Sequence, residues 1–339
     1  MSTKIEWADD TANAATGCSE ARLADGSMSP ECANCYARMM SARQEAMGNC
    51  IYNGVAERKG GSAVWTGVFR WSREMLAKRF NAMRPGQRVF LGSMTDLWHP
   101  SHEEGLRAAL ADEIRWLVNR QPQDRPKVIT LTKRAPELLA WQREFFPEGL
   151  PAWHWAGVTA GTQASANERI NSLLRVKTRG PRVLSAEPLL GPLDLTDIQT
   201  RVDDLGRDDT LHENALTGDF RWEESSEETG NHGTKLGWVI VGGESGSKAR
   251  PMHPDWARKL RDQCVAAGVP FFFKQWGEWL PEDHAHVLPD NVQGAILSGK
   301  GPPGRVSVWN GQNRATVFRV GKATAGRLLD GCTWNEVPE

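Results

Sequence analysis

Residues 127–134 read KVITLTKR, and this stretch decides the predicted fold because a short apolar run is followed at once by polar side chains. Lys127–Leu131 is rich in β-branched residues and too short for a typical helix, which favours a buried strand. A helical pattern follows at Ala135–Phe145. A strand joined to a helix in this way is the repeating unit of a parallel sheet covered by helices.

The same alternation extends along most of the chain. A weaker run at Thr11–Thr16 adds a first strand, so the sequence holds six or seven strand–helix units. This number predicts an α/β fold built as a complete or partial TIM-like barrel. The other clear strands are Arg88–Leu91, Trp155–Val158, Arg182–Ser185, Trp238–Val241 and Pro270–Phe273, and the other predicted helices are Glu31–Met47, Trp71–Met83, His102–Asn119, Ala164–Val176 and Pro254–Ala267.

Two segments interrupt this rhythm. Residues 196–236 carry eleven acidic and four basic side chains, a net charge of −7, and we interpret them as a solvated insertion or a mobile lid. The whole chain has a net charge of −1, so −1 minus −7 leaves +6 for the remainder, a mild basic bias. From Gly277 the pattern loosens. We therefore expect a barrel over residues 1–276 and a C-terminal appendage over residues 277–339.

The sequence gives no sign of export or of a membrane span. The first ten residues, MSTKIEWADD, lack the apolar run of a signal peptide, and no stretch approaches the roughly 20 apolar residues that cross a bilayer. We expect a soluble, cytoplasmic protein that does not bind membranes. In that reducing compartment the six cysteines are expected to be thiols rather than disulfides.

Polar residues collect directly after the predicted strands, where α/β barrels place their active sites. We expect these groups to surround one opening, although loops at strand ends are often polar simply because they face water. The residues are Met94-Thr95-Asp96, Thr132-Lys133-Arg134, Thr159, Gln163, Asn167, Glu187, Gly242-Gly243-Glu244-Ser245 and Lys274-Gln275.

Three cysteines near the N-terminus form the strongest motif. Cys18 is followed by thirteen residues and then by Cys32-Ala33-Asn34-Cys35 at the start of a predicted helix. The positive end of a helix favours thiolates, and three thiolates suit a [4Fe–4S] cluster with one iron left open. A zinc site completed by His99 or His102 is the main alternative, and a redox Cys-x-x-Cys pair is another.

A cysteine trio that ends in Cys-x-x-Cys-Tyr after the first strand of a barrel resembles the radical S-adenosylmethionine (SAM) superfamily. That superfamily usually has three residues between its first two cysteines, whereas this chain has thirteen. Its Gly-Gly-Glu motif normally follows the second strand, whereas Gly242-Gly243-Glu244 follows the sixth.

A closer likeness covers nearly the whole chain. The chain is similar to an uncharacterised phage and prophage family that is described as radical-SAM-like. Members of this family are sometimes encoded beside a three-Cys-motif partner protein. The motifs that carry the likeness are Ile5-Glu6-Trp7, Gly17-Cys18, Cys32-x-x-Cys35-Tyr36-Ala37, Ser93-Met94-Thr95-Asp96-Leu97, Leu131-Thr132-Lys133-Arg134, Glu187-Pro188-Leu189-Leu190-Gly191, Val241-Gly242-Gly243-Glu244-Ser245-Gly246 and Phe271-Phe272-Phe273-Lys274-Gln275-Trp276-Gly277.

These resemblances imply a role for each of the residues singled out. Each cysteine would bind one iron, and the fourth iron would bind the amino and carboxylate groups of SAM. Tyr36 is expected to take part in cofactor binding. The other expected SAM contacts are Thr95 and Asp96 for the amino group or ribose, Lys133 or Arg134 for the carboxylate, and Gly242 and Gly243 for close approach of the backbone. Glu187 and Glu244 are expected to bind ribose hydroxyls or to face substrate, and Lys274 and Gln275 to contact substrate.

Three functions follow as alternatives. The first is a radical SAM enzyme that modifies nucleic acid or nucleotides in the host cytoplasm, with Trp65, Trp71 or Trp98 as stacking surfaces. The second is a [4Fe–4S] binding protein that has lost SAM cleavage. The third is a zinc-stabilised scaffold that works with a partner protein.

Overall fold

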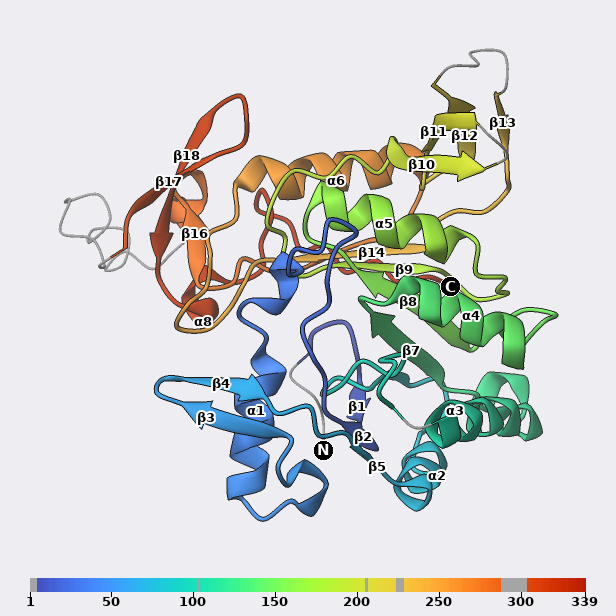
Figure 1. The fold of residues 1–339 in the computed structure, drawn as a ribbon. Coiled ribbons are helices and arrows are strands. Elements are labelled where there is room, and N and C mark those ends of the chain that lie inside the picture. The colour runs from blue at the N-terminus through green and yellow to red at the C-terminus, as the bar shows by residue number, and fades with distance from the viewer. Residues whose placement is uncertain (1–4, 103, 205–206, 224–228, 288–303) are drawn as a thin grey trace. The chain divides into compact units, whose positions relative to one another are not determined.

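The computed structural model describes residues 5–102, 104–204, 207–223, 229–287 and 304–339 (Figure 1). The chain divides into two compact units, which are described separately below. The first comprises Met1–Val158 and Ser172–Val183, and the second comprises Thr159–Asn171 and Leu184–Glu339. The predicted domain boundary after residue 276 lies inside the second unit.

The main sheet has seven strands, and their order in the sheet is their order along the chain. The pairs β1–β6, β6–β7, β7–β8 and β14–β15 are parallel, as expected when each strand is joined to the next through a helix. This topology is compatible with a partial TIM-like fold. In sheet order the strands are β1 (Asp10–Ala12), β6 (Arg88–Leu91), β7 (Lys127–Thr132), β8 (His154–Thr159), β9 (Val183–Ala186), β14 (Trp238–Gly242) and β15 (Phe271–Gln275).

In the first unit, helices cover the strands and two small antiparallel pairs flank them. Trp98 and Trp141 pack edge to face in its core, with ring centroids 5.7 Å apart. The helices are α1 (Tyr36–Ala46), α2 (Arg73–Asn81), α3 (Glu104–Trp116) and α4 (Ala135–Phe145), the pairs are β2 (Ala15–Thr16) with β5 (Arg70–Trp71) and β3 (Ala56–Lys59) with β4 (Ser62–Trp65), and the 3-10 turns are η1 (Pro30–Cys32), η2 (Cys50–Tyr52), η3 (Leu117–Asn119) and η4 (Pro122–Asp124).

His154 is a fully buried histidine on β8. Its Nε2 lies 2.9 Å from the Thr130 hydroxyl, and its ring packs against Trp141 with centroids 5.8 Å apart. Burial lowers the pKa of His154 to about 3. The ring is therefore neutral in the folded protein at pH 5, whereas in the unfolded chain it is charged.

We expect this buried histidine to make the protein acid-sensitive. Because its folded pKa is depressed, its stabilising contribution is present above pH 6.5 and declines as the pH falls toward the folded value. Between pH 8 and pH 5 the free energy of unfolding should fall by about 2 kcal/mol from this residue alone. Urea unfolding of His154→Phe should show that much less pH dependence than the wild type. A change at the exposed His232 (His232→Gln) should not reduce it, and an unaltered pH dependence in His154→Phe would contradict the assignment.

The second unit contains the last strands of the sheet and the helix that precedes β15. This helix, α6 (Pro254–Ala267), starts after His253, whose side chain accepts a hydrogen bond from the Asp255 backbone, and ends at Gly268 with φ of 63°. One of its faces is apolar. Trp256, Leu260 and Cys264 are buried, and Ala267 is partly buried. Helix α5 (Gln163–Leu174) belongs to this unit up to Asn171, and its last residues belong to the first.

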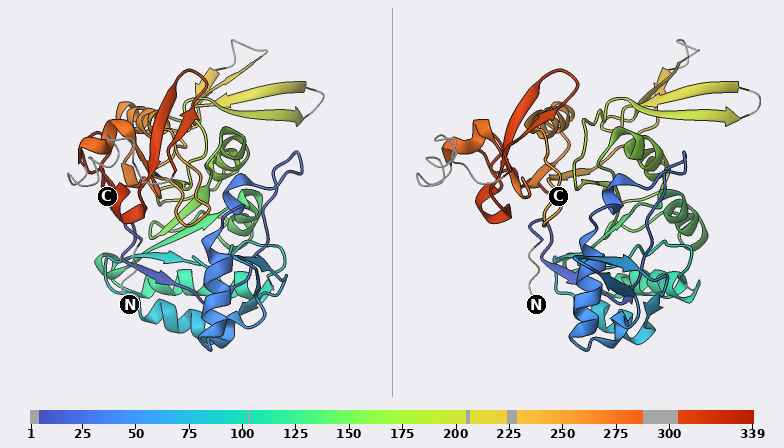
Figure 2. Two further views of the ribbon diagram at one scale, coloured as in Figure 1. Left: turned by 90° about the vertical axis from the view of Figure 1, so that its left-hand side faces the viewer. Right: turned by 60° about the vertical axis from the view of Figure 1, so that its left-hand side comes forward.

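The acidic segment 196–236 forms an antiparallel sheet, which the sequence analysis did not predict. In Figure 2 its yellow strands project away from the rest of the second unit. Residues 205–206 and 224–228 lie outside the described part of the chain. The strands are β10 (Ile198–Asp204), β11 (Arg207–Glu213), β12 (Asp219–Trp222) and β13 (Thr229–Asn231).

The C-terminal segment forms a three-stranded sheet and then returns to β15. Phe273 donates its backbone N–H to the Trp334 carbonyl at 3.0 Å, and Glu336 donates to the Phe271 carbonyl at 3.3 Å. Asn335 lies opposite Phe272 in an antiparallel bridge. The final residues therefore cover the outer edge of β15. The other elements are β16 (Trp279–Pro281), η5 (Glu282–Val287), β17 (Val306–Trp309), β18 (Arg314–Arg319) and α8 (Lys322–Ala325).

The predicted parallel strands are confirmed, with ends that shift by one or two residues. The weak first strand at Thr11–Thr16 is divided into β1, which joins the main sheet, and β2, which pairs with β5. Of the described helices, none is both long and apolar enough to cross a membrane.

Candidate cofactor site

The three cysteines lie in one loop of the first unit, between β2 and α1. Gly17 opens this loop with φ of 101°, and a Cβ there would lie 2.4 Å from the Val68 carbonyl oxygen, so the turn requires glycine. The helix predicted over Glu31–Met47 begins only at Tyr36. Cys35 is the residue directly before it, and Cys32 ends the separate turn η1. All three are free thiols; Cys32 is buried, and Cys18 and Cys35 are half-buried.

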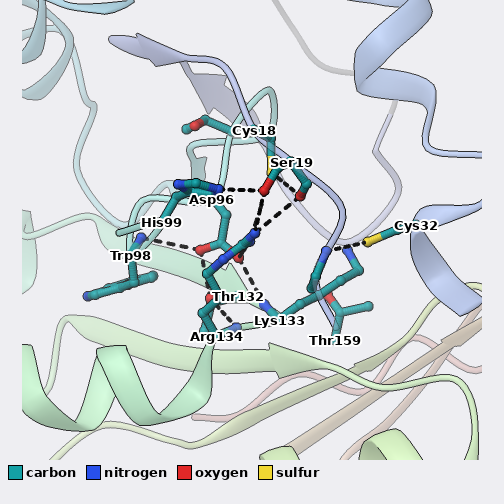
Figure 3. Close-up of polar contacts among 12 residues, drawn as sticks. Cys18, Ser19, Cys32, Asp96, Trp98, His99, Thr132, Lys133, Arg134 and Thr159 are labelled. Atoms are coloured by element: carbon teal, nitrogen blue, oxygen red, sulfur yellow. Dashed lines mark hydrogen bonds and ion pairs between the residues drawn. The ribbon is translucent and has the colours of Figure 1, made fainter. Parts of the chain in front are cut away.

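Hydrogen-bond donors approach two of these sulfur atoms. The Ala21 backbone N–H donates to Cys32 Sγ at 3.4 Å, and Arg134 Nη1 lies 3.9 Å from Cys18 Sγ (Figure 3). The Cys18 thiol itself donates to the Ser19 carbonyl at 3.2 Å. Burial, together with the charge of Asp96, raises the pKa of Cys18 to about 12, so the thiol is protonated in the metal-free protein.

The structure describes no three His, Cys, Asp or Glu side chains, within the ranges given above, that stand close enough to share one metal ion. The donor set nevertheless suits an iron–sulfur cluster in its chemistry, since the loop supplies three thiols and the Ala21 N–H, and Arg134 directs a second N–H at sulfur. A metal would displace the proton from Cys18 as it binds.

Asp96, which follows β6, is bonded to residues at the end of β7. One carboxylate oxygen accepts from the Thr132 hydroxyl at 2.6 Å and from the Trp98 backbone at 3.2 Å. The other accepts from the Lys133 backbone and from Arg134 Nη1, both at 3.1 Å. Burial alone would raise the pKa of Asp96, but the charge of Arg134 and these hydrogen bonds outweigh it and hold the pKa below its usual value. The group is a buried carboxylate with four donors.

Arg134 completes this connection on the side of the cysteines. Its Nη2 donates to the carbonyl oxygen and to the hydroxyl of Ser19, each at 3.2 Å. The guanidinium thus bridges Asp96, Ser19 and Cys18, as Figure 3 shows. Sequence reasoning missed Ser19, and its only signal was a hydroxyl directly after the first cysteine.

Thr95 and two histidines form the layer beside this network. The Thr95 hydroxyl donates to the Gly17 carbonyl and lies 2.8 Å from His102 Nε2, while His99 Nε2 lies 2.7 Å from the Ser19 hydroxyl. Burial lowers the pKa of each histidine to about 4, so both are neutral at pH 7. Of the two histidines considered as zinc ligands, His99 thus contacts Ser19 of the cysteine loop, whereas His102 contacts Thr95.

Two further predicted residues lie at this end of the first unit. The exposed Tyr36 donates its hydroxyl to the Ser93 carbonyl at 2.7 Å. Lys133 is half-buried, and its backbone N–H takes part in the Asp96 network. The structure therefore brings Cys18, Asp96, Lys133 and Arg134 into direct contact or into one bonded network.

In the second unit, the predicted residues form separate contacts. Lys274 Nζ pairs with Glu187 Oε1 at 2.9 Å, and Ser185 donates to the other Glu187 oxygen at 3.1 Å. A Cβ on Gly242 would lie 3.0 Å from Glu187 Oε1. Successive side chains of a strand point to opposite faces, so Gln275 does not contact the Glu187–Lys274 pair. Its side-chain amide donates to the Gly243 carbonyl at 2.9 Å.

Glu244 and Gly243 have clear roles inside this unit. Glu244 holds Arg250 through both carboxylate oxygens, with Nη2 at 2.6 Å and Nε at 2.8 Å. A Cβ on Gly243 would lie only 1.9 Å from the Trp276 carbonyl oxygen, so the chain itself requires glycine there. Gly243 was predicted to let a ligand approach the backbone closely, but the group that lies close to it is the Trp276 backbone carbonyl.

One comparison with known proteins identifies a family. The chain belongs to the family described as "Protein of unknown function (DUF5131)", whose model matches residues 2–338. No curated protein and no solved structure matches it.

Proposed function

We propose that this chain is an iron–sulfur protein in which Cys18, Cys32 and Cys35 hold a [4Fe–4S] cluster. The observation that carries the proposal is the cysteine loop, in which three free thiols lie within 18 consecutive residues. Two of the sulfur atoms accept from N–H groups, those of Ala21 and Arg134. Donors of this kind are typical around iron–sulfur clusters, where they stabilise charge on sulfur. Each thiol would bind a different iron, so the three need not surround a single ion.

The finer proposal is that the fold is a partial barrel of the radical SAM type and that SAM binds at the open iron. The parallel strand order and the position of the cysteines after the first strands support it. When bound, the cluster would supply the electron for reductive cleavage of SAM, which is the chemistry of the cofactor itself. The substrate class proposed is a nucleotide or nucleic acid, and a three-Cys-motif protein is the proposed partner.

The chain's own residues would hold the cysteines and bind charged parts of ligands. Asp96 fixes Arg134, and Arg134 fixes Ser19 beside Cys18. In the second unit, the Glu187–Lys274 pair offers a carboxylate and an ammonium group that are each mostly buried, with 13% and 19% of the side chain exposed. Either group is suited to a polar ligand, since burial strengthens its hydrogen bonds.

A second function, cluster binding without SAM cleavage, is supported by one specific observation. The polar atoms of Asp96 and Thr95 that were predicted to bind SAM already bond within the protein, and the Arg134 fork is occupied by Asp96 and Ser19. A SAM molecule that used these groups would have to replace internal hydrogen bonds. This arrangement favours a role in holding the loop.

One experiment separates these functions. The protein is purified without oxygen and analysed for iron, sulfide and its absorption spectrum, with about four irons per chain expected. Dithionite and SAM are then added, and 5′-deoxyadenosine is measured, with a reaction lacking dithionite as the control. Product formation supports the radical SAM enzyme, and an intact cluster without product supports the binding protein. Stoichiometric zinc in place of iron would overturn both iron–sulfur functions and would favour the zinc-stabilised scaffold.

A further inference from the structure

Arg134 occupies a position that its predicted role as a SAM ligand does not explain. It is the residue before α4, and its backbone N–H is fixed by the Thr132 hydroxyl at 2.8 Å. Its side chain is mostly buried, with 11% exposed, and its fork reaches Asp96, Ser19 and Cys18 Sγ. The contact to sulfur is the longest of these, at 3.9 Å.

We propose that Arg134 is a positioning residue that holds Cys18 and raises the reduction potential of the cluster. This inference rests on the proposed function. Adding one electron makes the cluster more negative, so a positive donor beside a ligating sulfur stabilises the reduced form. Asp96 fixes the guanidinium from the opposite side, and Ser19 fixes its second nitrogen, so the charge cannot move away easily.

The choice of arginine fits this role. A guanidinium remains protonated under all ordinary conditions, and its planar fork can donate to three partners at once. Cys32 receives its hydrogen bond from a backbone N–H, which no side-chain substitution removes. Arg134 is therefore the donor to sulfur through which the effect can be tested.

The test is a dithionite titration of the reconstituted full-length protein without SAM, followed by the electron paramagnetic resonance signal of the reduced cluster. Dithionite supplies the electron, and the cluster accepts it. We expect Arg134→Gln to keep its iron and to be at least tenfold harder to reduce, which corresponds to a midpoint potential lower by about 59 mV. Arg134→Lys, which keeps the charge, should stay within threefold of the wild type.

Arg107→Gln is the matched control, because Arg107 donates to the backbone carbonyls of Trp98 and His99 rather than to a cysteine. It should stay within threefold of the wild type. An Arg134→Gln protein with full iron and an unchanged potential overturns the inference, as does an equal shift in Arg107→Gln.

Two other outcomes are also decisive. If Arg134→Gln holds too little iron to titrate, Ser19→Ala, which loosens the guanidinium but keeps its charge, must lower the potential; an unchanged value overturns the inference. A wild-type protein that binds no iron overturns the proposed function itself and the inference with it. Iron in the wild type with no effect at Arg134 overturns the inference alone.

Discussion

Replacing Cys35 by alanine is expected to reduce the iron content of the reconstituted protein from about four atoms per chain to less than one. Two remaining thiols cannot replace the third ligand, and cubane clusters with two protein ligands are unstable. The substitution should leave the fold intact. Cys35 is half-buried, and its side chain makes no capping hydrogen bond to α1, so alanine removes little from the helix start.

The measurement combines iron and sulfide analysis with circular dichroism on the same sample. Cys264→Ala and Cys50→Ala are the controls, because Cys264 is buried in α6 and Cys50 is an exposed residue of η2. Both should bind iron like the wild type. A Cys35→Ala protein that keeps its cluster would show that the ligand assignment is wrong.

Replacing Asp96 by alanine is expected to reduce the free energy of unfolding of the metal-free protein by about 3–5 kcal/mol. The change leaves the Arg134 charge mostly buried and without its ion-pair partner, and it also removes the acceptor for the Thr132 hydroxyl. Thr132→Val, which deletes the hydrogen bonds of this hydroxyl to Asp96 and to the Arg134 backbone N–H, should cost about 2 kcal/mol.

Urea unfolding at pH 7 measures these differences. Asp9→Ala is the matched control, because Asp9 pairs with Arg88 in the same unit but has 43% of its side chain exposed, and such a pair contributes about 1 kcal/mol or less. The folded pKa of Asp96 lies below its usual value, so its contribution is present above the unfolded pKa and is lost as the pH falls through the folded one. Equal costs for Asp96→Ala and Asp9→Ala would argue against the network.

The parallel part of the fold could be predicted because its buried strands appear in the sequence as short apolar runs. The strands β6, β7 and β8 are apolar runs that are buried on both faces. The bounds of α4 and α6 agree with the prediction to the residue. Both helices begin with proline in their first turn, a strong local start signal.

The antiparallel parts could not be predicted in the same way. β10 reads IQTRVDD and pairs with β11, RDDTLHE, over its full length. Such strands are mostly polar and show no apolar run, so composition alone suggests a solvated loop. Their pairing depends on contacts between side chains on neighbouring strands, and the sequence of one strand does not show which residues will face it.

The sequence predicted several residues of the candidate site, but it did not predict the hydrogen bonds between them. Position after a strand correctly selected Asp96 and Arg134 as polar groups at one end of the sheet. It could not show that they bond to each other and to the cysteine loop, because Arg134 and Cys18 are 116 positions apart. The assigned SAM contacts of Asp96 and Arg134 remain a prediction, and the structure adds an internal role for both.

The return of the C-terminal residues to β15 has a practical consequence for handling the protein. Glu336 accepts from the Phe271 backbone through its carboxylate at 2.9 Å, and its carbonyl accepts from the Trp238 indole at 2.8 Å. A purification tag fused after Glu339 would begin three residues from these bonds. Losing them would expose the backbone of a strand that contains three consecutive phenylalanines, and such edges promote aggregation. Fusion at the other terminus is the safer design for the anaerobic experiments proposed here.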